Sequence, residues 1–475
     1  MNISNKLRVL LFFVYTIVCV SAFSSEKPNI ILCMADDQGW MDVAYNGNTV
    51  LKTPNLDELS EAGLRFDQFH AAAPVCSPTR GSVLTGRHPN RFGCFRWGYD
   101  LRPQEITIAE ALKTAGYATA HFGKWHLGSV LKGSPVNPGN SGFDEWYSAP
   151  DSYDMELDPM FSHQGTVIQR EGDSSLVTTE LALDFIRKQV KADQPFLTLI
   201  WFGSPHRPHE SAREFKEPYL DQGEKADFLG EIAGIDSAVG MLRRELRDLG
   251  IEQDTILWYC SDNGGLFHET AGGRGKKASY YEGGLRVPGI IEWPGHIELN
   301  RKTSMPANTV DIYPTLLDIV GVSMDNQPVL DGISLLPLIK GQSQTRLEPM
   351  GFWGYDRFIG RPNNKTLMVD LLKSQQEGTE YVPSRLDMRL DAAEVETVIE
   401  PHDFYGRAAW LDWPWKLHRI EKEDKPLAYE LYNLETDPME ENDVAAQNLE
   451  RVESLKARLE GWMESVINSQ NGGDY

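Results

Sequence analysis

Short apolar runs alternate with amphipathic segments along the first two thirds of the chain. The apolar runs predict buried strands over residues 28–34, 117–122, 195–202, 255–260 and 287–292. The amphipathic segments predict helices over residues 54–64, 107–115, 175–190, 224–249 and 308–320. Strands that alternate with helices are typical of a mostly parallel sheet with helices on both faces. The pattern therefore predicts a large α/β domain, to which we assign residues 23–345.

The pattern changes beyond residue 345. Residues 356–400 are charged and irregular, whereas residues 415–417 and 430–434 resemble antiparallel strands. Residues 443–466 have the spacing of a final amphipathic helix. We therefore expect a smaller α+β subdomain over residues 346–475, with an antiparallel sheet and a terminal helix, packed on the first domain.

The N-terminus has the order of features of a secretory signal. Lys6 and Arg8 precede an apolar run from Val9 to Val20, and small residues follow up to Ala22. We expect residues 1–22 to be a signal peptide cleaved near Ala22, which makes the protein exported, to the periplasm or the medium.

Two alternatives exist for this segment. A membrane anchor is disfavoured because the run is shorter than the ~20 residues of a spanning helix. A lipid-modified Cys19 is disfavoured because the preceding Val18 is bulky. No other stretch is apolar enough to span a bilayer, so we expect no stable membrane span.

The overall charge is strongly acidic. The net charge is −23, and it becomes −25 when a cleaved signal removes the two cations Lys6 and Arg8. Such a surface argues against nucleic acid as a partner. An anionic substrate would need positive charge gathered in one place.

Four cysteines remain beyond the signal segment, namely Cys33, Cys76, Cys94 and Cys260. Four cysteines in so long a chain do not make a disulfide scaffold. Cys33 and Cys260 lie in apolar runs, and we expect them to be buried thiols.

Polar residues that could bind a metal or take part in catalysis directly follow several predicted strands: Asp36 and Asp37, Lys124 and His126, His206, and Asp262 and Asn263. In parallel sheets, ligands collect at the carboxyl ends of strands. The acidic and amide side chains are hard oxygen donors that suit Ca²⁺ or Mg²⁺. The alternative for each pair alone is that it caps a turn.

The segment from Cys76 to Arg87 predicts a helix with a reactive start. Pro78 fits the first turn and Gly86 fits the end. Cys76 would then lie at the N-terminus, where backbone N–H groups favour an anion, with Arg80 one turn further on. Taken alone, the same pattern fits a buried or merely reactive thiol.

The motif Cys76-x-Pro78-x-Arg80, followed by Thr85-Gly86, resembles the sulfatase signature within the alkaline-phosphatase-like superfamily. The remaining segments of that family occur in order: Asp36-Asp37, Gly123 to Gly128, Ser204-Pro205-His206, Asp262-Asn263-Gly264, Lys277 with Glu282-Gly283-Gly284, and then Glu430 to Leu434 and Asp437-Pro438. The resemblance covers nearly the whole chain after residue 22. It is similar to carbohydrate sulfatases of the N-acetylgalactosamine-6-sulfatase and arylsulfatase types, and it implies an alkaline-phosphatase-like fold.

The resemblance implies a specific chemistry for sulfate ester hydrolysis. Cys76 would be oxidised to formylglycine by a separate maturation enzyme, a transient partner. One hydroxyl of the hydrated aldehyde would attack sulfur. The metal ligands would be Asp36, Asp37, residue 76, Asp262 and Asn263, with Ca²⁺ usual in the family and Mg²⁺ possible from the donors.

The resemblance also implies roles for the remaining polar groups. Arg80, Lys124 and Lys277 would stabilise the charge of the transferring group. His206, with Lys277, would protonate the leaving oxygen, and His126 would be the base on the second hydroxyl. Lys277 is preferred over the adjacent Lys276 because it lies five residues before Glu282, as the catalytic lysine of the family does. The alternative is that these lysines and histidines are surface or structural residues.

The substrate is the least defined part of the prediction. Variable loops near residues 92–103, 130–165 and 342–405 would hold the leaving group. Candidate sugar contacts in or near these loops are Arg96, Trp97, Tyr153, Asp154, His209, Trp353 and Tyr355, each of which could instead pack a loop. We expect a sulfated carbohydrate. The alternatives are a phosphonate monoester hydrolase or phosphodiesterase with the same centre, and a sulfated-glycan binding protein without turnover.

Overall fold

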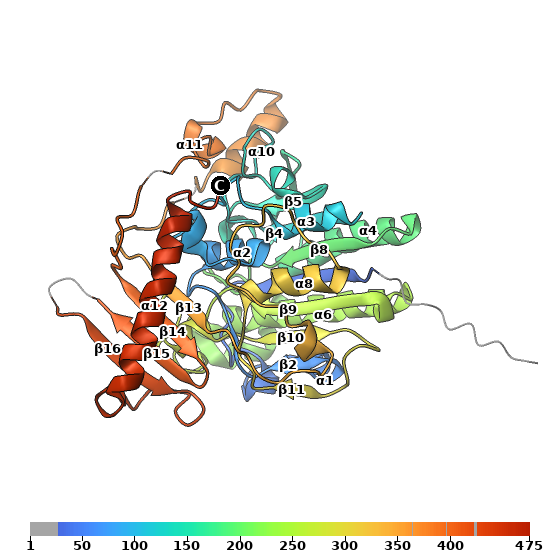
Figure 1. The fold of residues 1–475 in the computed structure, drawn as a ribbon. Coiled ribbons are helices and arrows are strands. Elements are labelled where there is room, and N and C mark those ends of the chain that lie inside the picture. The colour runs from blue at the N-terminus through green and yellow to red at the C-terminus, as the bar shows by residue number, and fades with distance from the viewer. Residues whose placement is uncertain (1–26, 363, 396, 422–424) are drawn as a thin grey trace, which may run out of the picture.

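The computed structural model describes residues 27–362, 364–395, 397–421 and 425–475. A large α/β domain holds a ten-stranded sheet, and a smaller antiparallel sheet with a long helix packs at one side of it (Figure 1). The predicted signal peptide, with Cys19, lies outside the described residues. Among the helices that are described, none has the length and apolarity required to cross a membrane.

Five parallel strands form the centre of the large sheet. In spatial order they are β9 (Thr255–Ser261), β1 (Asn29–Ala35), β8 (Phe196–Trp201), β4 (Ala118–Lys124) and β5 (Glu145–Ala149). Antiparallel strands extend both sides: β10 (Gly289–Glu292) beside β9, and β6 (Met160–His163) and β7 (Thr166–Gln169) beyond β5. β2 (Leu64–Phe66) and β11 (Arg301–Thr303) complete the β10 edge. The mostly parallel sheet predicted from the sequence is confirmed.

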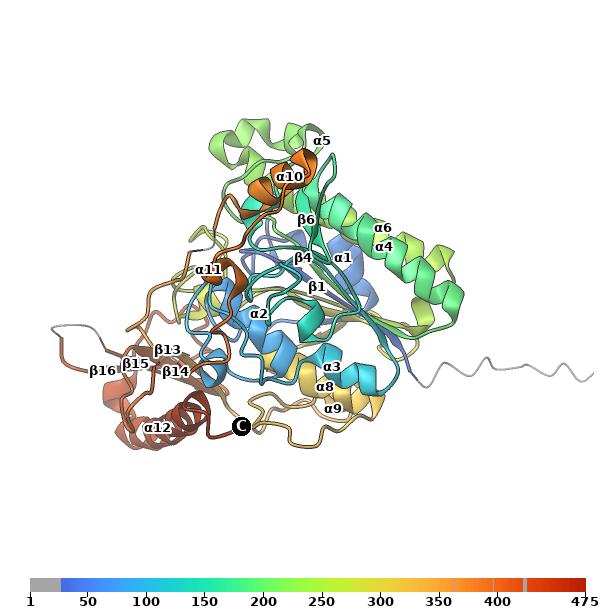
Figure 2. The same cartoon turned by 90° about the horizontal axis from the view of Figure 1, so that it is seen from above.

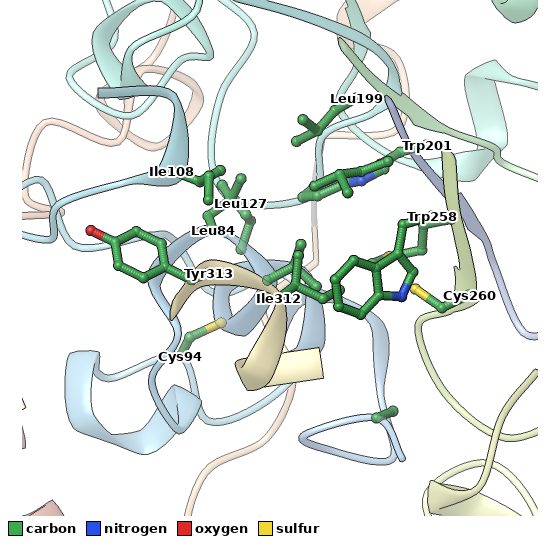
Figure 3. Close-up of a cluster of buried hydrophobic side chains, with 14 of the residues drawn as sticks. Leu84, Cys94, Ile108, Leu127, Leu199, Trp201, Trp258, Cys260, Ile312 and Tyr313 are labelled. Atoms are coloured by element: carbon green, nitrogen blue, oxygen red, sulfur yellow. The ribbon is translucent and has the colours of Figure 1, made fainter. Parts of the chain in front are cut away.

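Helices cover both faces of this sheet (Figure 2). One face packs against α2 (Cys76–Thr85), α3 (Ile108–Thr114), α8 (Ile312–Val320) and α9 (Leu336–Ile339). The other packs against α1 (Pro54–Ala62), α4 (Ser174–Ala192) and α6 (Ala226–Asp248). The strands are buried on both sides, so their residues alternate between two hydrophobic clusters, which explains their continuous apolar runs. Figure 3 shows the first cluster, where Trp201 and Trp258 meet Ile312.

The smaller sheet is fully antiparallel, in the order β13 (Met350–Gly354), β14 (Arg407–Asp412), β15 (Trp415–Ile420) and β16 (Ala428–Asn433). The terminal helix α12 (Leu449–Gln470) packs on it through residues such as Leu455, Leu459 and Met463. This helix begins later than predicted because the Asp443 carboxylate accepts hydrogen bonds from the N–H groups of Leu431 and Ala445, which holds a turn there. The predicted antiparallel sheet and terminal helix are confirmed.

The irregular structure expected over residues 356–400 is wrong in part. Helix α10 (Leu367–Glu377) lies there and buries Leu367, Met368 and Leu371. Its apolar residues are few and are followed by polar ones, so the helical period was weak in sequence. The domain boundary at residue 345 stays a prediction.

Short elements connect these parts. They are the strands β3 (Phe69–His70) and β12 (Ala307–Asn308), the helices α5 (Arg213–Lys216), α7 (Glu282–Leu285) and α11 (Arg385–Met388), and 3-10 turns at Ala44–Asn46, Pro89–Phe92, Gly139–Ser141, Ser152–Asp154, Glu217–Lys225, Glu252–Asp254, Thr309–Asp311 and Ala445–Gln447. The predicted start of a helix at Asn308 is thus a 3-10 turn that leads into α8.

Candidate active site

Neighbouring strands bring two acidic segments together. Asp36 and Asp37 follow β1, and Asp262 and Asn263 follow the adjacent parallel strand β9. Asp262 Oδ1 accepts a hydrogen bond of 3.1 Å from the Asp37 N–H, and Asn263 donates to Asp37 Oδ1 at 2.8 Å. The Asp37 backbone has φ of 68°, a conformation that costs a non-glycine residue about 1–3 kcal/mol and is concentrated at functional sites.

Cys76 is the first residue of α2 and points at this acidic group. Its Sγ lies 3.4 Å from Asp36 Oδ1 and 3.5 Å from Lys277 Nζ. Gly86 ends the helix in a left-handed conformation, as the sequence predicted. Burial, and next the Asp36 carboxylate, raise the pKa of the Cys76 thiol well above its usual value. The unmodified side chain is therefore a neutral thiol, which is a poor nucleophile.

Three cations surround the same point. Arg80 donates to Asp262 Oδ2 from Nη2 at 2.8 Å and from Nε at 3.1 Å. Lys124 Nζ donates to Asp36 Oδ2 at 2.5 Å, and Lys277 Nζ donates to Asp37 Oδ2 at 2.7 Å. Burial alone would lower the pKa of Lys124, but Asp36 raises it above its usual value, so the ammonium stays charged. Positive charge is gathered here on an otherwise acidic protein.

His126 lies beside this group, next to a residue that the sequence did not reveal. Its Nε2 is 3.6 Å from Asp151 Oδ2, and Lys124 Nζ is 3.5 Å from Asp151 Oδ1. Burial lowers the pKa of His126 to about 3, so the imidazole is neutral at pH 7 and able to accept a proton.

His206 and Lys277 form the open side of the group. Their side chains are 17% and 22% exposed, whereas Asp36, Arg80 and Lys124 are fully buried. His206 Nε2 lies 3.7 Å from Asp37 Oδ2, and its Nδ1 lies 2.8 Å from Ser152 Oγ. A substrate enters from solvent, so its outer part would meet these two side chains.

Sequence reasoning missed Asp151 and Ser152. Both follow β5, a short strand that was not predicted because Glu145 and Tyr147 interrupt its apolar pattern. The available signal was the same one that located the other residues, a polar pair after a strand: Trp146 to Ala149 precedes Pro150-Asp151-Ser152.

The donor set fits a hard divalent cation. Asp36, Asp37, Cys76 and His206 offer ligand atoms that all lie within 4.8 Å of one another. Asn263 Oδ1 is buried and, among the described residues, has no hydrogen-bond partner, which is the state of an acceptor reserved for a ligand. Asp262 lies beside this cluster, since its Oδ1 accepts from the Asp37 N–H, and with Asp262 and Asn263 oxygen donors would outnumber the others, as Ca²⁺ or Mg²⁺ requires.

Comparisons with known proteins identify the family. The family described as Sulfatase matches residues 28–322, more than half of the chain. The chain belongs to the sulfatase family, and it is an enzyme of the class that hydrolyses sulfate esters.

Individual relatives are similar over about two thirds of their length. N-acetylgalactosamine-6-sulfatase of Mus musculus is 32% identical over 366 residues, 69% of each chain. Arylsulfatase G of Rattus norvegicus is 30% identical over 379 residues, which cover 68% of this chain and 70% of that protein. The solved structure of Ps i-CgsB in complex with k-i-k-neocarrahexaose shares the fold, with a TM-score of 0.73 at 24% identity and 94% coverage of both chains.

The predicted sugar-contacting residues divide into packed and accessible ones. Trp353 is buried and donates its indole N–H to the Tyr405 carbonyl, and Tyr355 is buried and donates its hydroxyl to Asp403. Arg96 forms an ion pair with Asp356. These contacts hold the three side chains in place, and their part in sugar binding stays a prediction. Asp154 is buried as well, and burial raises the pKa of its carboxyl to about 7.

Tyr153 and Trp97 are the accessible aromatic candidates. Tyr153 is 42% exposed, and its ring lies 6.4 Å from the His206 ring in an edge-on arrangement. Trp97 is 43% exposed and packs against Gly360, where a Cβ would collide with the indole. His209 is held by Glu231, whose Oε2 lies 3.4 Å from His209 Nδ1. Tyr153 is therefore an accessible sugar-contact candidate whose ring contacts a site residue, His206.

The buried carboxyl of Glu231 on α6 should make the stability of the protein depend on pH. Burial raises the pKa of its carboxyl to about 7, whereas an unfolded glutamate titrates near ~4.3. Between these values the folded state keeps a proton that the unfolded state has lost, so stability falls as pH rises. Glu231→Gln is expected to raise the free energy of unfolding by up to about 3 kcal/mol at pH 8 and to have little effect at pH 4. Urea denaturation at both pH values measures this.

A glutamate on the same helix provides the matched control. Arg187 lowers the pKa of Glu245, so Glu245→Gln should cost stability at pH 8 and not below pH 4, the opposite sign. An equal effect of Glu231→Gln at pH 4 and pH 8 would contradict the assignment.

Proposed function

We propose that this sulfatase is exported, acts on sulfated carbohydrates, and uses formylglycine derived from Cys76 beside a divalent cation. The observation that carries the proposal is the position of Cys76, enclosed by acidic oxygen donors and by the cations of Arg80, Lys124 and Lys277. An exported location rests on the apolar N-terminal run. The neutral state of the unmodified thiol supports a role that depends on its conversion.

The residues of the chain divide the work around the sulfate group. Asp36, Asp37, Asp262 and Asn263 would hold Ca²⁺ or Mg²⁺, which would polarise the sulfate oxygens, while formylglycine at position 76 would provide the hydroxyl nucleophile. Arg80 and Lys124, fully buried and charged, offset the negative charge that is spread over the transferring group.

Proton transfers fall to the remaining side chains. His126 is neutral and lies beside Asp151, and it would accept the proton of the second hydroxyl at residue 76. Lys277 and His206 face the leaving oxygen on the open side. Burial alone would lower the pKa of Lys277, but Asp37 raises it well above its usual value, so Lys277 carries a proton at neutral pH. The burial of His206 lowers its pKa, so it assists mainly as a neutral hydrogen-bonding partner.

A cavity next to this centre supports a saccharide as the leaving group. It has a volume of about 690 Å³, within the usual size range of small-molecule sites. Its lining includes Gly128 and Pro150, which are close in sequence to His126 and Asp151, together with Asn364, Asp387 and Arg389. Such paired donors and acceptors suit sugar hydroxyls.

The contribution of Tyr153 tests the carbohydrate proposal. Tyr153→Ala is expected to raise KM for sulfated disaccharides about tenfold, because a ring–sugar contact is lost, while KM for 4-nitrophenyl sulfate changes little. Tyr153→Phe keeps the ring and should have the same KM values as the wild-type enzyme. Initial-rate kinetics on a panel of defined sulfated saccharides measure both. A panel without any desulfated saccharide would overturn the substrate class.

The alternative chemistry is tested in the same preparation. A phosphonate monoester hydrolase or phosphodiesterase could use the same kind of centre, so an aryl sulfate and an aryl phosphodiester are compared as a pair. We expect kcat/KM to favour the sulfate. Much faster cleavage of the diester would overturn the proposal, and no turnover of either by fully converted enzyme would favour a glycan-binding protein.

A further inference from the structure

The segment that carries Lys277 is hydrogen-bonded to the C-terminal subdomain. We call residues 264–281 the Lys277 loop; it leads from the end of β9 to α7 (Glu282–Leu285) without regular secondary structure. On one side of Lys277, Arg274 donates to the Tyr432 hydroxyl at 2.9 Å. On the other side, the Tyr281 hydroxyl donates to Glu430 Oε2 at 2.6 Å. Both flanks of the loop are thus held by strand β16.

A buried ionic network holds the end of the loop. Glu282 follows the loop directly, and its Oε1 accepts a hydrogen bond of 2.7 Å from Lys416 on β15. Glu440 accepts from the Glu282 N–H at 2.6 Å, and its other oxygen lies 3.3 Å from Lys416 and 2.6 Å from His418. The two carboxylates and the ammonium are at most 1% exposed.

Lys416 and Glu282 keep their charges in this network. Burial alone would lower the pKa of Lys416, but Glu282 and Glu440 raise it above its usual value. Likewise burial alone would raise the pKa of Glu282, but Lys416 and His70 hold it well below its usual range. Buried ion pairs contribute little net stability because desolvation opposes them, whereas their geometry is specific. This network is better suited to fixing a position than to stabilising the subdomain.

Backbone hydrogen bonds of the Lys277 loop fix Lys277 relative to the centre. The Lys277 N–H donates to the Gly265 carbonyl at 3.0 Å, and the Ala278 N–H donates at 2.9 Å to the carbonyl of Pro74, two residues before Cys76. Ala278 has φ of 70°, a strained conformation that the surrounding contacts must maintain. Lys277 Nζ is thereby placed between Asp37 and residue 76.

We propose that Lys416, Glu440, Glu430 and Tyr432 form a clamp by which the C-terminal subdomain positions Lys277 at the leaving oxygen. These are positioning residues, since they act through the Lys277 loop and do not touch the reacting atoms. The inference rests on the proposed role of Lys277 in the sulfatase reaction. It gives the subdomain a part in the chemistry besides its part in the fold.

The clamp has a kinetic signature that a merely structural role lacks. A displaced Lys277 stabilises the departing oxygen less, which matters most when the leaving alcohol is weakly acidic. Loss of the clamp therefore steepens the dependence of kcat on leaving-group pKa and leaves KM nearly unchanged. Small misplacements of a catalytic group can cost about 10²-fold in rate.

The experiment compares aryl sulfates whose phenols span a range of pKa. For Lys416→Met, kcat should fall about tenfold to a hundredfold for the poorest leaving group and by less than about threefold for 4-nitrophenyl sulfate. Glu430→Gln should show the same trend more weakly. Glu430 is 25% exposed, so this variant decides the matter if Lys416→Met does not fold.

A matched control loosens the same subdomain elsewhere. Arg91 pairs with Asp331 at 2.7 Å and donates to Ser465 and Ser469 of α12, and these three partners lie outside the Lys277 loop. Arg91→Met should lower the melting temperature but keep the leaving-group dependence. A steeper dependence in Arg91→Met, or none in Lys416→Met and Glu430→Gln, overturns the clamp. Lys277→Met is measured alongside: if it leaves the dependence unchanged, the proposed role of Lys277 fails instead.

Discussion

Cys76→Ala is expected to reduce kcat for sulfate esters by at least about 10⁴-fold, the scale seen when a nucleophile is removed from a complete site. The loss should be chemical and not structural. Cys76 is buried as a neutral thiol, so alanine removes neither a charge nor a strong hydrogen bond. We expect the melting temperature to change by only a few degrees, as for a small core truncation. Enzyme co-expressed with a maturation enzyme is assayed with 4-nitrophenyl sulfate.

Cys94 provides the matched control for this variant. It is also a free, fully buried cysteine, with Sγ 3.7 Å from the Tyr99 carbonyl, and it does not contact the site residues. Cys94→Ala should keep its activity. Mass spectrometry should show that the peptide containing residue 76 has lost sulfur and two hydrogens and gained one oxygen, while the Cys94 peptide is unchanged. Turnover by Cys76→Ala above about 1% of the original rate would contradict the nucleophile assignment.

The sequence was most informative where strands are buried on both faces. Their apolar runs predicted β1, β4, β8 and β9 within a few residues, and polar residues at their carboxyl ends were therefore projected to one edge of the sheet. Asp36 and Asp262 illustrate this, since the β1–β9 pairing places them together. Their metal-binding roles stay predictions, because their proximity fits a cation without assigning it.

Other features depend on information that a local pattern does not hold. Strands β5 and β13 have only five residues each, and charged residues at both ends of β14 leave a short apolar run, so their hydrophobic signal is weak. Asp151 was missed for this reason. The pairing of Lys416 with Glu282 joins residues 134 positions apart, and no spacing rule connects them. The exposure of Trp353 was likewise not predictable, because an aromatic residue in a variable loop can equally be buried.

Carboxylates and cations are balanced in number around the centre. Asp36, Asp37 and Asp262 face Arg80, Lys124 and Lys277, and most of these groups are buried. A divalent cation would add positive charge to a group that the lysines and arginine already balance, and a bound sulfate would return it toward neutrality. Cation and substrate binding should therefore support each other.

Asp36→Asn is expected to lower kcat at least about 10³-fold and to remove the stabilising effect of calcium. Asp36 accepts from Lys124 at 2.5 Å and lies 3.4 Å from Cys76 Sγ and 3.8 Å from Arg80. The amide keeps the shape of the side chain but loses the charge that a cation and Lys124 both need. Calcium at about a hundred times its Kd stabilises a folded protein by ~2.7 kcal/mol. The melting temperature of the wild-type enzyme should therefore rise with calcium and fall with a chelator.

Asp42 separates this effect from the general cost of changing a buried carboxylate. It is also fully buried, and it accepts from the Gly39 N–H at 2.8 Å, but it does not contact Cys76. Burial raises the pKa of Asp42 to about 6, so an amide resembles its protonated form closely. Asp42→Asn should keep both activity and the calcium response. If Asp36→Asn gains as much thermal stability from calcium as the unmodified enzyme, the cation lies elsewhere, and the centre built around residue 76 must work by its own charges.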